Sequence, residues 1–261
     1  MSIAYTPKLP EGNVNISKQS PLREFFKLLV GIAVTVLVVY VSLGFVINAI
    51  VPFIPVAVEK KLGGAVVAGF KKKTALEQQP RVQAILDTLL PHLDNNPFDI
   101  TISVASSDQV NAFALPGGHI VVFEGLLKEI ESDNELAFVI GHELGHFVNR
   151  DHLRGMGRGL VLSLIALLLG NDSGISGAVI NTLHFSEQRF SQKQESKADA
   201  VGLDLLYKTY GSTRGSVSFF KKLEKEDKIS EFAYFFASHP SPQERIDALE
   251  KLIGERYASG R

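Results

Sequence analysis

The chain has 261 residues, of which 27 are Lys or Arg and 28 are Asp or Glu, so its formal net charge is −1. This near balance, with both signs mixed along most of the chain, argues against nucleic acid or another polyanion as the main partner. The absence of cysteine excludes disulfides and thiolate metal sites, so any metal must be held by histidine and carboxylate.

Residues 28–58 contain no charged side chain, which predicts a transmembrane anchor after a polar N-terminal tail over residues 1–27. A helix needs roughly 20 residues to cross the hydrocarbon of a bilayer, and Leu28–Val51 supplies them before Pro52. A cleaved signal peptide is the alternative, but it would have a shorter apolar region and a small-residue cleavage site. Basic residues lie on both sides of the span, so the positive-inside rule does not decide its orientation.

A juxtamembrane linker is expected over residues 59–80, followed by one catalytic domain over residues 81–261. The domain begins with a predicted helix, Arg81–Leu90, because its apolar residues have helical spacing. Three strands are predicted next, at Asp99–Val104, Asn111–Leu115 and His119–Phe123. A small sheet therefore precedes the helical part of the domain.

The remaining segments favour helices. Ser132 and Glu135 fit a capping box, in which each side chain satisfies the other's backbone amide, and it opens a helix over Glu135–Arg150. Gly159–Gly170 is apolar almost throughout but too short to span a bilayer comfortably, so a buried helix is expected and a membrane-dipping hairpin is the alternative. Further helices are expected at about Ser186–Tyr210, at Arg214–Glu226 and after a second capping box at Ser241–Glu244.

The first chemical motif is His142-Glu143-Leu144-Gly145-His146, the H-E-x-x-H pattern. On a helix, positions i and i+4 share one face, so both imidazoles can bind a single ion while Glu143 leans over its open side. The predicted cap and the apolar neighbours indicate that this helix is buried. The alternative is two surface histidines on an ordinary helix.

A catalytic zinc held by two histidines needs a third protein ligand and leaves its fourth position to water. His152 stands where an extended H-E-x-x-H-x-x-G-x-x-H pattern would put a third histidine, but Asn149 replaces the glycine of that pattern. Glu195 is the better candidate, because Asp199 follows it on the same face of a predicted helix. There Asp199 could accept the outer N–H of a ligand histidine. On spacing alone, surface ion pairs with neighbouring lysines explain both acids equally well.

Four blocks of the chain resemble peptidase family M48, and their order and approximate distances agree with that family. The blocks are Asn111–Gly118, His142–His146, Phe190–Asp199, and Ser238-His239-Pro240 followed by Arg245-Ile246. The resemblance implies a zincin-like (gluzincin) α+β domain, mostly helical with a small sheet, plus one N-terminal transmembrane helix. Members often have arginine at the position of Gln192, which puts in doubt any charged role there.

The resemblance also implies the site residues. It assigns one Zn²⁺ per chain to His142, His146 and Glu195, with Glu143 as general base and Asp199 as an outer partner. A zinc there would polarise the scissile carbonyl and lower the pKa of its water towards about 7, while Glu143 takes the proton and passes it to the leaving amine. The implied activity is a membrane-anchored zinc endopeptidase acting on protein substrates, in membrane or envelope protein quality control. Related single-span members further imply a catalytic domain outside the cytoplasm.

The sequence leaves the role of His239 open. His239 could stabilise the oxyanion, or occupy the open metal position and hold the enzyme off, or simply pack in a turn before Pro240.

The block at Asn111, Ala112, Phe113 and Ala114 is expected to be an exposed strand that receives a peptide as an added strand. A plain core hairpin is the alternative. Three other histidines, His92, His119 and His184, have no assigned partner and are expected to be structural.

Functions of other classes are also conceivable. A catalytically silent, membrane-bound scaffold could keep the zinc and bind protein partners, but it would have no need of Glu143. A transporter or channel component is disfavoured by a single span without intramembrane charge.

Overall fold

The computed structural model describes residues 20–60, 63, 77–94, 96–157, 190–223, 235, 239 and 242–257. The chain divides into two compact units, Met1–Phe45 and Val46–Arg261. Most of the linker expected over residues 59–80, the apolar segment Gly159–Gly170 and His184 lie outside the described residues.

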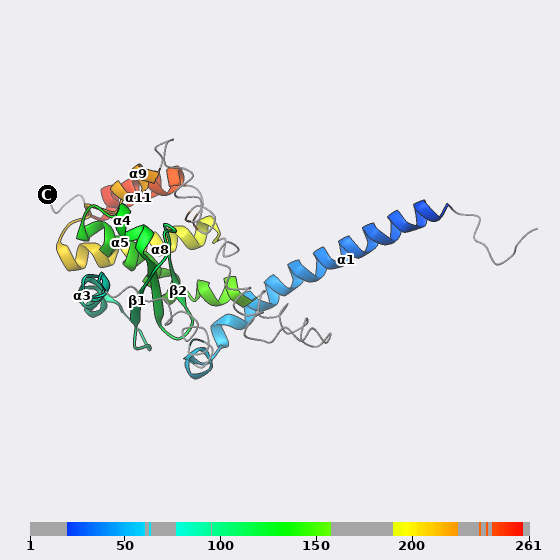
Figure 1. The fold of residues 1–261 in the computed structure, drawn as a ribbon, viewed down its shortest axis with the longest axis horizontal. Coiled ribbons are helices and arrows are strands. Elements are labelled where there is room, and N and C mark those ends of the chain that lie inside the picture. The colour runs from blue at the N-terminus through cyan, green and yellow to red at the C-terminus, as the bar shows by residue number, and fades with distance from the viewer. Residues whose placement is uncertain are drawn as a thin grey trace, which may run out of the picture. The chain divides into compact units, whose positions relative to one another are not determined.

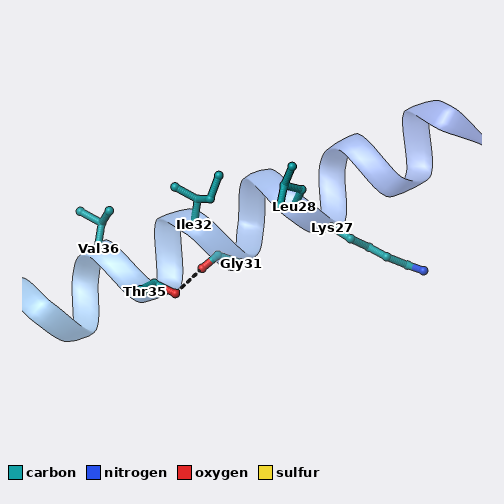
Figure 2. Close-up of a pocket in the computed structure, with 6 residues that line it drawn as sticks. All are labelled: Lys27, Leu28, Gly31, Ile32, Thr35 and Val36. Atoms are coloured by element: carbon teal, nitrogen blue, oxygen red, sulfur yellow. Dashed lines mark hydrogen bonds between the residues drawn. The ribbon is translucent and has the colours of Figure 1, made fainter.

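Helix α1 spans Pro21–Ile50 and passes into a 3-10 turn, η1, at Val51–Phe53 (Figure 1). It therefore begins inside the segment expected to be a polar tail. By length and composition, Pro21–Phe53 can cross a membrane, and it is the one such helix in the described part of the chain. Along it, the Thr35 hydroxyl donates to the Gly31 carbonyl at 2.8 Å (Figure 2), so that this polar side chain is satisfied within the helix.

The three predicted strands are confirmed near their expected bounds. They are β1 Thr101–Ala105, β2 Ala112–Leu115 and β3 His119–Phe123, and their order in the sheet is β1-β3-β2. Strand β3 pairs in parallel with β1 and antiparallel with β2. The turn between β2 and β3 contains Gly117 and Gly118, whose φ angles of 83° and 88° lie in the left-handed region that favours glycine.

Helices make up most of the rest. They are α3 Gln79–Leu89 with the 3-10 turn η3 Leu90–His92, α4 Glu124–Glu129, α5 Asp133–Val148, α8 Gln192–Tyr210, α9 Ser218–Leu223 and α11 Pro242–Arg256. Helix α4 was not expected from the sequence, and α9 begins at Ser218 rather than at Arg214. Helix α8 ends at Gly211, which has a φ of 62° as a left-handed cap requires.

The predicted capping box at the start of α5 is only half formed. The Ser132 side chain accepts the Glu135 N–H at 3.2 Å, as expected. The Glu135 carboxylate, however, accepts the N–H of Glu131 at 2.9 Å instead of that of Ser132. Its other contacts, with Ser218 and Lys222, draw it toward α9 and away from the reciprocal position.

Helix α5 lies in the middle of the main core, packed chiefly against α8 and also against β2 and α3 (Figure 1). The helices α5 and α8 approach backbone to backbone. A Cβ atom added at Gly145 would lie 2.7 Å from the Ala198 Cα, and one at Gly141 would lie 3.0 Å from the Gly202 Cα. This close approach brings the H-E-x-x-H face of α5 against the Glu195 face of α8.

Candidate active site

The predicted metal ligands lie together between α5 and α8. His142, His146, Glu195 and His239 each offer one ligand atom, and these atoms lie within 4.8 Å of one another. The His142 Nε2 is 3.7 Å from one Glu195 oxygen, and the His146 Nε2 is 3.4 Å from the other. All four residues are buried, so the group is not a chance surface cluster.

The donor atoms fit a divalent metal. The Nε2 of His146 is fully buried yet has no hydrogen-bond partner in the described part of the chain, which is costly unless an ion binds it. Two imidazoles and one carboxylate are also a donor set that zinc accepts in catalytic sites.

Each histidine is oriented by a carboxylate on its far side. The Nδ1 of His142 lies 2.9 Å from Asp199 Oδ1, and the Nδ1 of His146 lies 3.1 Å from Asp151 Oδ2. Because an ionised carboxylate only accepts, each Nδ1 carries a proton, so the neutral form of each imidazole presents the lone pair of its Nε2 to the centre. Asp199 thus contacts His142, the contact expected of an outer partner. Asp151 was missed, and its position five residues after His146, just past the turn that follows α5, was the only signal in the sequence.

Arg245 of α11 is the second residue that sequence analysis did not assign a role, although it lies in one of the family-like blocks. Its guanidinium is buried and contacts both acids of α8, with Nε 2.8 Å from Asp199 Oδ2 and Nη1 2.7 Å from Glu195 Oε2. It also stacks over the Phe220 ring, 4.2 Å from its centroid. Arg245 therefore compensates the negative charge that Asp199 and Glu195 bring into the core.

The site shifts the pKa values of its groups in different directions. Burial, together with the charges of Arg245 and His146, lowers the pKa of His142 to about 3. Burial alone would lower the pKa of His146, but its hydrogen bond with Asp151 and the nearby charges of Glu195 and Glu143 raise it to about 9. Since a metal binds only neutral imidazole, binding at this site would displace the proton of His146.

The pKa values of the two glutamate carboxyl groups, Glu143 and Glu195, also shift in opposite directions. Burial is the main cause that raises the pKa of Glu143, as suits a group that must accept a proton near neutral pH. Burial would also raise the pKa of Glu195, but the charges of His239 and Arg245 hold it far below its ordinary value. Glu195 therefore stays ionised, as a metal ligand must.

His239 lies inside the donor group. Its Nδ1 is 3.2 Å from Glu195 Oε1 and 3.3 Å from His142 Nε2, and its Nε2 is 3.7 Å from Glu143 Oε1. These polar contacts disfavour the interpretation in which His239 only packs in a turn, although its ring also stacks on Phe235.

His152, the alternative third ligand, faces away from the metal group. Its Nε2 is 2.8 Å from Glu59 Oε1, and its ring stacks on Phe147. His119, expected to be structural, is buried in the sheet with its two nitrogens 2.7 and 2.9 Å from the hydroxyls of Thr101 and Ser103. His92 ends η3 and is partly exposed.

The strand expected to receive the substrate is not exposed in this structure. Strand β2 is at the edge of the sheet, yet Ala112, Phe113 and Ala114 are all buried. Ala112 and Ala114 are part of the main core, while Phe113 packs edge-to-face on Phe123. Asn111 is buried as well, with its side-chain oxygen accepting the Ala112 N–H at 2.9 Å.

The chain also resembles known proteins over most of this domain. Residues 76–253 match peptidase family M48. The chain is 35% identical over 162 residues to the mitochondrial metalloendopeptidase OMA1 of Arabidopsis thaliana, covering 60% of this chain and 32% of that protein. It is 30% identical over 179 residues to the metalloprotease LoiP of Escherichia coli (strain K12), covering 66% and 69%.

A third relative is the beta-barrel assembly-enhancing protease of Yersinia pestis, 26% identical over 208 residues, covering 72% of this chain and 42% of that protein. The match spans about a third of the OMA1 proteins of Arabidopsis thaliana and Danio rerio, 32% and 36% of their lengths. Metalloproteases of family M48 are zinc-dependent, and the buried His and Glu group can bind such an ion. With more than half of its length matched, the chain belongs to peptidase family M48.

Proposed function

We propose that the chain is a zinc-dependent endopeptidase in which His142, His146 and Glu195 bind the metal and Glu143 is the general base. One observation carries the proposal. The buried Nε2 of His146 has no hydrogen-bond partner among the described residues, and it faces the same centre as the His142 Nε2 and the Glu195 carboxylate. A buried nitrogen without a hydrogen bond destabilises the fold, and a cation bound between these atoms would remove that cost.

Each residue of the proposed site has a separate role in the reaction. A bound zinc would supply a Lewis acid and an activated water. Asp199 and Asp151 hold the two imidazoles in the tautomer that binds metal. Glu143, on the same helix and buried, accepts the proton of the attacking water and returns it to the leaving amine.

The site is closed in this structure, because Glu143 and Glu195 are each 1% exposed. A peptide can reach Glu143 only after part of this cover moves. We propose that His239 is part of the cover and fills the open metal position, since its Nδ1 lies within the donor group. His239→Ala should then raise the basal rate of cleavage. A fall in the rate instead would favour the oxyanion role.

The protein substrate is proposed to bind as a strand added to β2, the edge strand beside α5. Such binding uses main-chain hydrogen bonds, so it predicts broad specificity. Because β2 is buried in this structure, a peptide can bind there only after the cover of this edge moves.

We further propose that α1 anchors the protein in a membrane, with the catalytic domain outside the cytoplasm, and that the protein acts in membrane or envelope protein quality control. The apolar surface of α1 supports the anchor, and the name of the assembly-enhancing relative supports the role in quality control. The chain should stay with membranes in alkaline carbonate, and protease protection of tagged vesicles should report the side of the domain. Extraction by carbonate would contradict the anchor.

The enzyme is distinguished from a silent scaffold by Glu143→Gln. Glutamine fills the same volume but cannot take a proton, so zinc and fold should be retained while the cleavage of casein falls by at least about 10²-fold. If the wild-type chain cleaves unfolded proteins and the variant does so equally well, Glu143 is not the base. If the wild-type chain cleaves nothing across a broad panel, the scaffold is favoured.

A further inference from the structure

After α5, the turn residues Asn149 and Arg150 lead into a further helix that begins at Asp151. We call residues 149–152 the turn after α5, and its two sides have different partners. Arg150 has a φ of 58°, a left-handed conformation that is uncommon for a residue with a side chain. On one side of this turn, Arg150 and His152 face residues 51–59, which follow α1. On the other side, Asp151 faces the candidate zinc site.

The first side is a buried ionic network. Both oxygens of Glu59 are used: Oε1 lies 2.8 Å from His152 Nε2, and Oε2 lies 2.6 Å from Arg150 Nη2. Glu59 is 0% exposed. Arg150 also donates to the carbonyls of Val51 at 2.9 Å and Ile54 at 2.8 Å, which follow the last turn of α1.

The negative charge of Glu59 is compensated by its neighbours, Arg150 and His152. Burial alone would raise the pKa of its carboxyl, but the hydrogen bonds and charges of His152 and Arg150 lower it below its ordinary value. A buried carboxylate with partners on both oxygens is fixed in place, since removing either partner leaves charge unpaired in the core.

Apolar contacts join the same two segments. We call residues 46–59 the anchor base. Within it, Ile47 and Val51 form a buried cluster with Leu153, just after the turn. A Cβ atom added at Gly157 would lie 2.8 Å from Ile47 Cγ2, so the helix after the turn rests closely on the anchor base.

On the second side of the turn, Asp151 orients His146, one of the proposed metal ligands. Asp151 Oδ2 lies 3.1 Å from His146 Nδ1, and Asp151 Oδ1 accepts from the side chain of Gln194 at 2.8 Å. Asp151 is flanked by the two residues that Glu59 binds. A displacement of Arg150 and His152 would therefore move the carboxylate that orients His146.

We propose that Glu59 is a positioning residue for the metal site: by holding Arg150 and His152 on either side of Asp151, it sets the orientation of His146 and ties the anchor base to the zinc ligand. Glu59 touches neither metal nor substrate, and it acts only through the turn. The inference rests on the proposed function, because it takes His146 as a ligand.

The test is the zinc affinity of the full chain in detergent, measured by chelator competition. Glu59→Gln keeps the volume and an acceptor for Arg150 but removes the charge. It should weaken zinc binding by at least about threefold, and by less than the roughly 10–100-fold expected for Asp151→Asn. In the Asp151→Asn background, Glu59→Gln should add nothing, because its path to the metal is already broken.

Glu135→Gln is the matched control, since Glu135 is also a buried carboxylate that binds a basic residue, Lys222, at the opposite end of α5. It should leave zinc affinity unchanged. The visible spectrum of the cobalt-substituted chain should shift in Glu59→Gln and not in this control. If Glu59→Gln does not fold, Arg150→Lys, which keeps the charge but loses the two carbonyl contacts, should weaken zinc binding in the same way.

Unchanged zinc affinity in Glu59→Gln, an equal loss in Glu135→Gln, or additive losses with Asp151→Asn would each overturn the inference. These outcomes differ from a failure of the proposed function, in which the wild-type chain itself would bind no zinc or His146→Ala would bind it as tightly.

Discussion

A buried carboxylate binds residues at each end of helix α5, but only one of the two carboxylates is connected to the metal group. At the N-terminal end, Glu135 accepts from Glu131, Ser218 and Lys222, and none of these contacts leads to the metal group. At the C-terminal end, Glu59 lies 91 residues before Arg150 and belongs to the segment that follows α1.

The difference shows how one helix can serve both stability and function. The N-terminal end fixes where α5 begins, close to residues that are near in sequence or lie on α9. The C-terminal end continues directly into Asp151, the partner of His146. Changes at the first end should therefore alter the stability of the fold, and changes at the second should alter the metal site.

The largest effect is expected at the C-terminal end. Asp151→Asn should weaken zinc binding by roughly 10–100-fold, because the amide cannot hold the Nδ1 proton of His146 as a carboxylate does. Asp199→Asn should weaken it similarly through His142. Chelator competition measures both. Unchanged zinc affinity in both variants would mean that these acids do not orient the ligands.

A smaller effect of a different kind is expected at the N-terminal end. Glu135→Gln removes the charged partner of Lys222, and hydrogen bonds to charged groups contribute about 1.5–3 kcal/mol. The free energy of unfolding should fall by about this amount in chemical denaturation, with zinc content unchanged. A loss of zinc would show that the two ends are not separate.

The smallest effect is expected for Ser132→Ala, which removes only the side chain that caps α5. Loss of an N-cap of this type costs about 1 kcal/mol. Denaturation of the variant should show a parallel shift with the same slope. A loss of several kcal/mol would mean that Ser132 has a role beyond the cap.

The sequence predicts those features of the structure that are determined by residues close together along the chain. The H-E-x-x-H spacing predicts that His142 and His146 share a face, and the small residues Gly145 and Ala198 allow the helices to meet. Helix α5 and strand β3 could be placed closely for the same reason, because caps, turns and periodicity act within a few residues.

The parts that the sequence did not predict depend on contacts between distant segments. Nothing near Glu59 indicates that it binds Arg150 and His152, so the segment around it was expected to be a linker. The burial of β2 likewise depends on packing from other elements, which alternation along the strand does not reveal.

The zinc content of the purified chain tests the central claim most directly. The wild-type protein should carry about one zinc per chain, and Glu195→Ala, prepared beside it, should lose most of it, since Glu195 is the only carboxylate in the donor group of the described residues. His142→Ala and His146→Ala should lose it as well. Full zinc occupancy in Glu195→Ala would contradict the account.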